Sequence, residues 1–231
     1  HDDFYGGNWV REFEQTAIRH FNVKHAVSIN SLTSGLIAAI GALDIGLGDE
    51  VIVSPWTMSA TAIAPLWWNA IPVFADIEDE TFTLDPVSIE SNITPYTKAI
   101  IAVDIFGHSA DMDSINKIAK EHGLLVISDC AQSPNARYKN KLAGTLSDIG
   151  GYSFNYHKHI HCGEGGLLIT DDDSFAERLQ LIRNHAEGVV EGHVSDYCGR
   201  QSAFRGTARR SYLAPSGSPV RLRYPDPLMV P

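Results

Sequence analysis

GGYSFNYHKHIHCGEGGLLIT, residues 150–170, contains two short alternating apolar runs, at 151–154 and 166–169, on either side of a loop. Runs of period 2 bounded by glycine predict two strands. The loop carries Lys158 and the glycine-dense turn 163–166. Partial desolvation of a lysine held between two strands would favour its free amine, which can attack an aldehyde and form a Schiff base. The alternative is a surface lysine in a hairpin loop, so the rest of the chain must decide.

Working outward from this stretch, strands and helices alternate along the chain. Buried strands are predicted at residues 26–29, 50–53, 71–75, 98–103 and 124–128. Helices are predicted at residues 8–21, 36–43, 58–68, 85–91, 111–122 and 173–185. Alternation of this kind indicates parallel βαβ units, and therefore a three-layer α/β/α fold with a mostly parallel, doubly wound central sheet.

Ligands of such sheets bind at the carboxyl ends of the strands. The turn Asn30–Gly35 follows the first predicted strand and opens a helix, whose first amides suit a phosphate. Thr33 and Ser34 would add hydroxyl donors. The same residue types also favour plain helix capping, so the residues by themselves leave both interpretations open.

Asp129 and Gln132 lie at the end of the strongly apolar strand LLVIS, within one turn of each other. A carboxylate in that position is either a cap for the turn or a counter-ion for a cationic group in the site. Trp56 follows the second predicted strand, at the same expected edge of the sheet.

Composition excludes several classes of function. A net charge of −10 argues against a nucleic-acid or anionic-membrane binder, and no run approaches the 18 apolar residues of a membrane span. Neither the G-x-G-x-x-G nor the G-x-x-x-x-G-K-[ST] phosphate-binding pattern is present. The first residues do not form a signal peptide, and three sparse cysteines suit a reducing compartment, so a cytoplasmic location is expected.

Three histidines alternate around the lysine, at His157, His159 and His161, with Cys162 adjacent. On an extended strand they would share a face, and both residue types are good zinc ligands. The spacing does not match a standard zinc pattern, so no metal site is predicted, and a metal-binding or non-catalytic module remains the alternative. His157 and His159 are instead expected to shape a pocket around Lys158.

The chain changes character near residue 193. Residues 194–231 hold six arginines, five of the eleven prolines and no lysine, and they show no helical or strand period. We expect a domain over residues 1–192, followed by an atypical Arg/Pro-rich tail at 193–231. The tail is interpreted either as a basic, loop-like extension or as a translation artefact such as a change of reading frame.

Eight ordered blocks across residues 8–190 together resemble the pyridoxal-phosphate-dependent sugar aminotransferases of the DegT/DnrJ/EryC1/StrS family. The blocks are FEQTAIRHFNVKHAVSINSLTSGLIAAIGALDIGLGDEVIV, SPWT, PVFADIEDETFTLD, ITPYTKAIIAVDIFGHSADMD, VISDCAQ, YSFNYHK, CGEGGLLIT and LIRNH. The resemblance implies the fold of aspartate aminotransferase and pyridoxal 5'-phosphate as the cofactor.

The resemblance also implies roles for individual residues. Lys158 matches the lysine that forms the Schiff base with the cofactor and moves protons, and Asp129 matches the acid paired with the pyridine nitrogen. Gln132 matches the glutamine beside the ring hydroxyl, and Trp56 the aromatic residue stacked on the ring. The residues that match the phosphate cradle are Thr33, Ser34 and Ser153.

By this resemblance the reaction moves an amino group from an amino acid, usually glutamate, to a nucleotide-linked keto sugar. A sugar dehydratase using the same cofactor is the runner-up, although some of those relatives carry histidine where Lys158 stands. Family members are homodimers with a smaller C-terminal domain, so this chain is interpreted as the large domain with a shortened N-terminus. Leu32 departs from the family, which commonly has glycine there.

Overall fold

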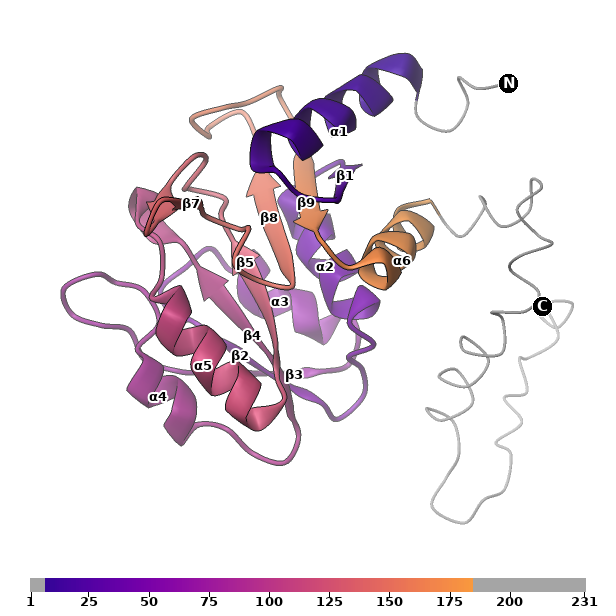
Figure 1. The fold of residues 1–231 in the computed structure, drawn as a ribbon. Helices are drawn as coiled ribbons and strands as arrows, with labels where there is room; N and C mark the ends of the chain where they lie inside the picture. The colour runs from indigo at the N-terminus through magenta and orange to yellow at the C-terminus, as the bar shows by residue number, and fades with distance from the viewer. Residues whose placement is uncertain (1–6, 185–231) are drawn as a thin grey trace, which may run out of the picture. The chain divides into compact units, whose positions relative to one another are not determined.

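Seven strands form the central sheet of residues 7–184, the part of the chain that the computed structural model describes, in the order β1-β9-β8-β5-β4-β2-β3 (Figure 1). The strands are β1 (His25–Ile29), β2 (Glu50–Val53), β3 (Ile71–Phe74), β4 (Thr97–Val103), β5 (Leu125–Asp129), β8 (Ile149–Ser153) and β9 (Gly166–Thr170). The five strands β3, β2, β4, β5 and β8 run parallel, which confirms a mostly parallel sheet.

The other two strands, β1 and β9, do not pair in parallel with their neighbours, although the βαβ pattern predicts parallel pairing for the first strand of the chain. β9 pairs antiparallel with β8, and β1 pairs antiparallel with β9 at the edge of the sheet. β9 therefore separates β1 from the parallel strands. Two reversals restore the original direction, so β1 points the same way as β8 and ends at the same edge.

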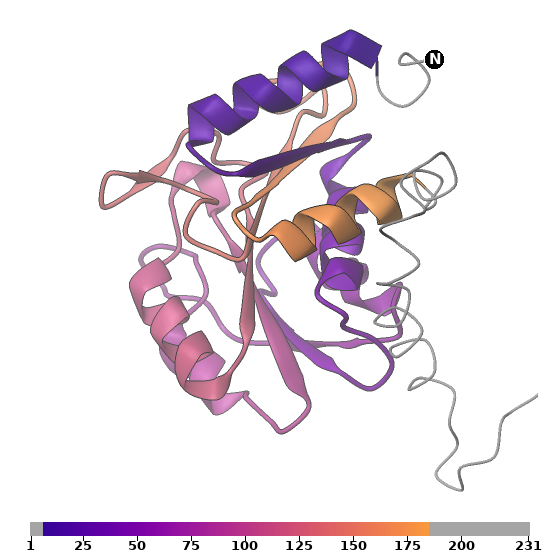
Figure 2. The ribbon, with the colours of Figure 1, turned by 45° about the vertical axis from the view of Figure 1, so that its right-hand side comes forward.

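Helices cover both faces of the sheet, as Figure 2 shows, and this confirms the predicted three-layer architecture. One layer contains α2 (Leu32–Ala42), α3 (Ala60–Leu66) and α6 (Asp173–Arg183). The other contains α1 (Gly7–Phe21), α4 (Pro86–Ser91) and α5 (Met112–His122).

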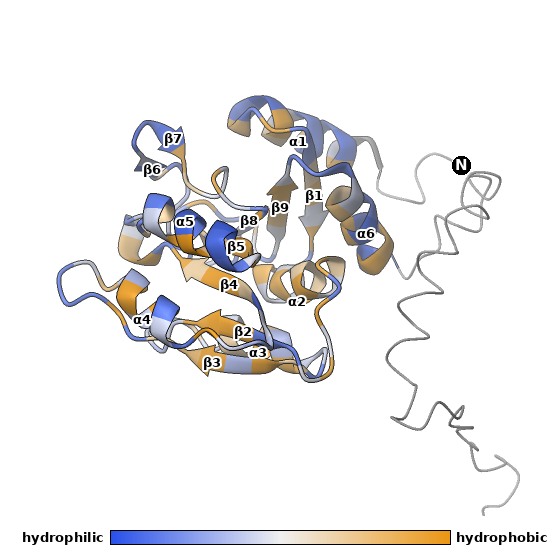
Figure 3. Ribbon diagram, turned by 60° about the horizontal axis from the view of Figure 1, so that its bottom comes forward, coloured by the Kyte–Doolittle hydropathy of each residue, from blue (hydrophilic) through white to orange (hydrophobic). Residues whose placement is uncertain are grey.

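The central strand β4 shows why both layers are needed. Its alternate residues Ala99 and Ile101 pack in the core beneath α2, whereas Ile100 and Ala102 pack in the core beneath α5. All four side chains are fully buried. A strand segment buried on both faces is apolar, so residues 99–103 of β4 are all apolar, and the β4 arrow has the hydrophobic colour in Figure 3.

Several helices begin directly after a residue whose side chain caps the helix N-terminus. Asp85, Asp111 and Asp172 each accept a hydrogen bond from a backbone N–H in the first turn of the helix that follows. The predicted start of α2 at residue 36 is wrong by four residues. Ser31 is the cap, accepting from the Ser34 N–H at 3.2 Å, and the helix begins at Leu32.

Three short elements were not predicted: a 3₁₀ turn (Ile105–Gly107) and the hairpin of β6 (Arg137–Tyr138) and β7 (Lys141–Leu142). Two-residue strands are too short to show a period of 2.

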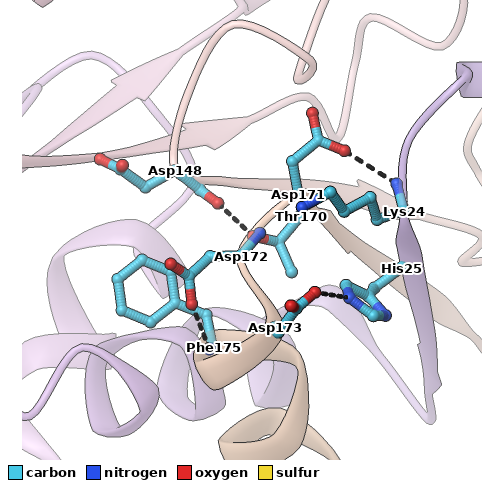
Figure 4. Close-up of polar contacts among 8 residues, drawn as sticks. All are labelled: Lys24, His25, Asp148, Thr170, Asp171, Asp172, Asp173 and Phe175. Atoms are coloured by element: carbon cyan, nitrogen blue, oxygen red, sulfur yellow. Dashed lines mark hydrogen bonds and ion pairs between the residues drawn. The ribbon is translucent and has the colours of Figure 1, made fainter.

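Each residue of the acidic run 171–173 makes a polar contact at the start of α6 (Figure 4). Asp172 caps the helix, while Asp171 accepts from the backbone N–H of Lys24 at 2.8 Å. Asp173 lies 2.8 Å from Nε2 of His25, and this hydrogen bond lowers the pKa of Asp173. These contacts join the start of α6 to the start of β1.

Gly41 provides a test of the packing between α2 and α3. A Cβ at this position would lie 2.1 Å from ring carbon Cζ2 of Trp68, whose indole N–H donates to the Ile37 carbonyl at 2.7 Å. Gly41→Ala should therefore destabilise the fold by about 1–3 kcal/mol in urea unfolding, although alanine is the better helix former by about 1 kcal/mol.

Gly46→Ala is the matched control, because its Cβ would come no closer than 3.9 Å to the Trp68 carbonyl. It should change stability by no more than about 0.5 kcal/mol. A Gly41→Ala variant as stable as the parent would contradict the packing described here.

Candidate functional site

The predicted site residues gather at one edge of the sheet. Asp129 ends β5 and is in register with Gly151 on the parallel strand β8. Ser153 ends β8, opposite Gly166, and Gly166 also lies opposite Ile29 at the end of β1. The turn after β1, the end of β8 and the end of β5 therefore share an edge, as the strand-end argument predicted.

A cavity of about 490 Å³ opens at this edge. It is lined by Met58, Phe106, Ala131, Gln132, His157, Lys158 and His159. Two of the predicted cofactor residues, Lys158 and Gln132, are in this set, and so are both histidines expected to shape the pocket. The volume lies within the range of small-molecule sites, roughly 300–1,000 Å³.

Asp129 is buried at this edge and held by two donors. The Thr61 hydroxyl donates to its Oδ2 at 2.8 Å, and the Ala131 N–H donates to Oδ1 at 3.1 Å. Burial raises the pKa of Asp129, while these hydrogen bonds and the positive charge of Lys158 lower it in part. Lys158 thus lies within electrostatic reach of Asp129.

None of the ion pairs within residues 7–184 includes Asp129. Buried carboxylates are normally paired, because their desolvation is otherwise uncompensated. A cationic ligand group next to Asp129 would offset that cost, so the site favours a ligand with a protonated nitrogen at this point.

Lys158 lies half-buried in the loop between β8 and β9. Its backbone N–H donates to the Asn155 carbonyl at 2.9 Å, and the Asn155 amide donates to Glu164 at 2.5 Å across the base of the loop. The loop consists of turns and bends, so the extended strand that would align His157, His159 and His161 is absent from it. Within the described residues no three His, Cys, Asp or Glu side chains could hold a metal.

The hydroxyl-rich turn lies at the start of α2. Thr33 is exposed and Ser34 half-buried, both in the first turn of the helix, and the Ser34 hydroxyl bonds to the hydroxyl of the cap residue Ser31 at 2.6 Å. Ser153 Oγ is half-buried and accepts from the Asn155 N–H at 3.4 Å. These hydroxyls and the first amides of α2 are donors suited to a phosphate.

Glycines let this turn approach the sheet. A Cβ on Gly166 would lie 2.8 Å from the backbone nitrogen of Leu32, and one on Gly151 would lie 2.5 Å from Cδ1 of Leu32. The Leu32 side chain is buried over these two glycines. The departure at Leu32 is therefore accommodated by packing beneath the turn.

Trp56 is half-exposed and is not among the residues that line the cavity. Its ring lies 6.1 Å from that of Phe82, which in turn lies 6.4 Å from that of Phe106 at the cavity wall. Phe82 and Phe106 have φ values of 59° and 53°, a strained conformation for bulky residues that concentrates at functional sites. Trp56 thus belongs to an aromatic group beside the cavity.

Three contributors carry no signal in the sequence. Thr61 donates to Asp129 across 68 positions of the chain, and Met58 and Phe106 are apolar residues that line the cavity without belonging to a recognisable site motif. Only the folded chain brings them to the site.

The arrangement fits a pyridoxal-phosphate-type ligand. An amine and a buried acid without an ion-pair partner among residues 7–184 lie near one cavity. Hydrogen-bond donors that could bind a phosphate lie on the same edge of the sheet. The fold and these side chains together fit the class of pyridoxal-phosphate-dependent transferases, and the chain has relatives of that class.

The chain belongs to the DegT/DnrJ/EryC1/StrS aminotransferase family, which matches residues 1–206. The spore coat polysaccharide biosynthesis protein SpsC of Bacillus subtilis is 42% identical over 179 residues, 78% of this chain and 46% of SpsC. The GDP-perosamine synthase of Caulobacter vibrioides is 42% identical over 177 residues, 77% of this chain and 48% of the synthase.

Among solved structures, that of S. venezuelae DesV in complex with a ketimine intermediate has a TM-score of 0.76 at 38% identity, and the match covers 78% of this chain and 49% of DesV. The chain thus spans about half the length of the curated relatives it matches. Members of this family depend on pyridoxal or pyridoxamine phosphate. No helix within residues 7–184 has the length and apolar character to cross a membrane.

The electrostatics of Asp129 lead to a pH prediction. Because burial raises the pKa of Asp129, the folded chain binds its proton more tightly than the unfolded chain does, and stability falls as pH rises above the unfolded value of about 3.9. Asp129→Asn removes this ionisation cost. The ligand-free variant should be more stable than the parent at neutral pH and should lose that advantage near pH 4.

Thermal unfolding from pH 4 to pH 8 measures the difference between the two proteins. A difference that does not change with pH would show that Asp129 carries no desolvation cost.

Proposed function

We propose that this chain is the cofactor-binding part of an aminotransferase that moves an amino group from an amino acid to a nucleotide-linked keto sugar. The observation that carries the proposal is the position of Lys158 in the cavity wall, where its positive charge acts on the buried Asp129. Two relatives support the substrate class by their names, GDP-perosamine synthase and dTDP-3-amino-3,4,6-trideoxy-alpha-D-glucose transaminase.

Pyridoxal phosphate, when bound, supplies an aldehyde and an electron-accepting ring. Nζ of Lys158 is the amine that would hold the aldehyde, and as a free base it would take a proton from the donor amino acid and return it. Oδ1 and Oδ2 of Asp129 would keep a proton on the ring nitrogen. Gln132, in the cavity wall, would orient the ring hydroxyl, and Trp56 would cover one face of the ring.

The phosphate would be held at the start of α2. Its first amides point out of the helix, and the hydroxyls of Thr33, Ser34 and Ser153 lie at the same edge of the sheet. Short side chains and close backbone contacts position these donors, which suits a group that must stay fixed during a reaction.

Two points separate the aminotransferase from the dehydratase alternative. Lys158 provides the amine that proton transfer requires, whereas some dehydratases of the family carry histidine in that position. The amino donor is expected to be glutamate by family resemblance.

Lys158→Ala should abolish the visible absorbance band that the purified chain develops with pyridoxal phosphate, because no other lysine lines the cavity in residues 7–184. Lys141→Ala, at an exposed lysine on β7, is the control and should leave the band unchanged. A band that survives in Lys158→Ala would reject the assignment of this lysine.

The domain division at residue 193 lies outside the described residues and stays a proposal: a large domain at 1–192 followed by an atypical tail at 193–231. A homodimer is also proposed. An exposed apolar stripe at helical spacing runs along α3 to its C-cap residue, and consists of Ile63, Leu66 and Trp67, with 41%, 53% and 68% of their surfaces exposed. Such a stripe suits a self-complementary contact between two copies.

Trp67→Asp should convert the dimer into a monomer, because it replaces the largest apolar side chain of the stripe with a charge. Sedimentation velocity measures the change. Trp9→Asp is the control, since Trp9 is 83% exposed on α1, which packs against β1 at the opposite edge of the sheet from β3. Loss of the dimer in both variants, or in neither, would contradict the proposed interface.

A further inference from the structure

Asp104 is a buried acid without an assigned role. It follows the last residue of β4 and is 1% exposed. Its backbone N–H donates to the carbonyl of Asp129 at 3.0 Å, which extends the pairing of β4 with β5 by one residue. The two acids therefore sit at the ends of neighbouring strands, on the edge that holds the cavity.

The polar contacts of Asp104 join two loops. Oδ1 accepts from the Ala110 N–H at 2.8 Å, on the loop before α5. Oδ2 accepts from the Cys130 thiol at 3.1 Å, and the Ser133 hydroxyl donates to the Asp104 carbonyl, both on the loop after β5. A side chain that accepts from both loops fixes one against the other.

Both loops carry the wall of the cavity. Phe106 lies on the first, and Ala131 and Gln132 lie on the second. The Phe106 N–H donates to Oε1 of Gln132 at 3.0 Å, so the loops also meet at the cavity itself. This contact orients the Gln132 side chain. It requires the two loops to stay at the separation that the hydrogen bonds of Asp104 maintain.

Keeping Asp104 buried is costly. Burial raises its pKa, the hydrogen bonds from Ala110, Cys130 and Ser109 lower it in part, and the negative charge of Asp129 raises it further. The charge of Asp104 also contributes to raising the pKa of Cys130 and of Tyr152 on β8, after the larger effect of burial. No ion pair within residues 7–184 includes Asp104. A neutral residue would cost less free energy to bury there, so the presence of an acid favours a role for Asp104 at the site.

We propose that Asp104 is a positioning residue that holds Asp129 and Gln132 at the cavity by clamping the loop after β4 to the loop after β5. The inference deepens the proposed function and rests on it only for the consequence on cofactor affinity. The clamp itself can be measured without any cofactor.

The first experiment is amide hydrogen exchange on the cofactor-free chain. Asp104→Ala should speed exchange at the N–H groups of Phe106 and Ala131 about tenfold, because the acceptor that joins their loops is lost. Asp104→Asn should restore most of the protection, since an amide oxygen still accepts from Ala110. Asp111→Ala is the control: Asp111 lies on the same connection but caps α5, so its loss should lower the unfolding temperature without exposing these two amides.

Titration with pyridoxal phosphate follows in the same variants. Asp104→Ala should raise the dissociation constant about tenfold, a loss of about 1.4 kcal/mol, with Asp104→Asn and Asp111→Ala within about twofold of the parent. If Asp104→Ala does not fold, Cys130→Ala removes one arm of the clamp and should increase exchange at Ala131 about threefold.

Unchanged exchange in a folded Asp104→Ala, or an Asp104→Asn variant as poorly protected as Asp104→Ala, would overturn the clamp. A parent chain that binds no pyridoxal phosphate but shows the exchange pattern would reject the proposed function and leave the clamp standing.

Discussion

The desolvation of Asp129 is the constraint on which the site depends. Its carboxyl group is buried at the end of β5 with two hydrogen bonds and no ion pair among the described residues, so the folded chain holds an acid whose charge is only partly compensated. Stability by itself would favour a neutral residue there. A ligand that brings a cation to this point would offset the desolvation of Asp129. Burial of the acid therefore favours the binding of cationic ligand groups over neutral or anionic ones.

The rest of the fold serves to keep that acid in place and to bring an amine to it. Parallel pairing aligns the ends of β4, β5 and β8, and the reversal through β9 returns β1 to the same edge. Glycines at 151 and 166 then allow the start of α2 to lie directly on the sheet. An acid, a lysine and a helix start from distant parts of the chain thus surround one edge without any direct link in sequence.

The site also shows how buried polar groups depend on one another. Thr61 donates to Asp129, the Cys130 thiol donates to Asp104, and the Phe106 N–H donates to Gln132. Each of these bonds joins segments more than 20 residues apart, so the loops at the cavity are positioned by tertiary contacts. The bonds to Asp129 and Asp104 are buried, so loss of either donor is expected to affect the neighbouring groups.

Local sequence determined the seven strands of the central sheet, five of the six helix starts to within two residues, and the list of candidate side chains at strand ends. These follow from hydrophobic periodicity and from capping residues such as Asp85 and Asp172, which act over a few residues. Only the tertiary structure decided the place of β9 between β1 and β8, antiparallel to both, and the start of α2 at Leu32. It also decided that Thr61 and Asp104 lie beside Asp129. Strand order and buried hydrogen bonds arise from contacts between residues far apart in the chain. A pattern within a few residues does not predict such contacts.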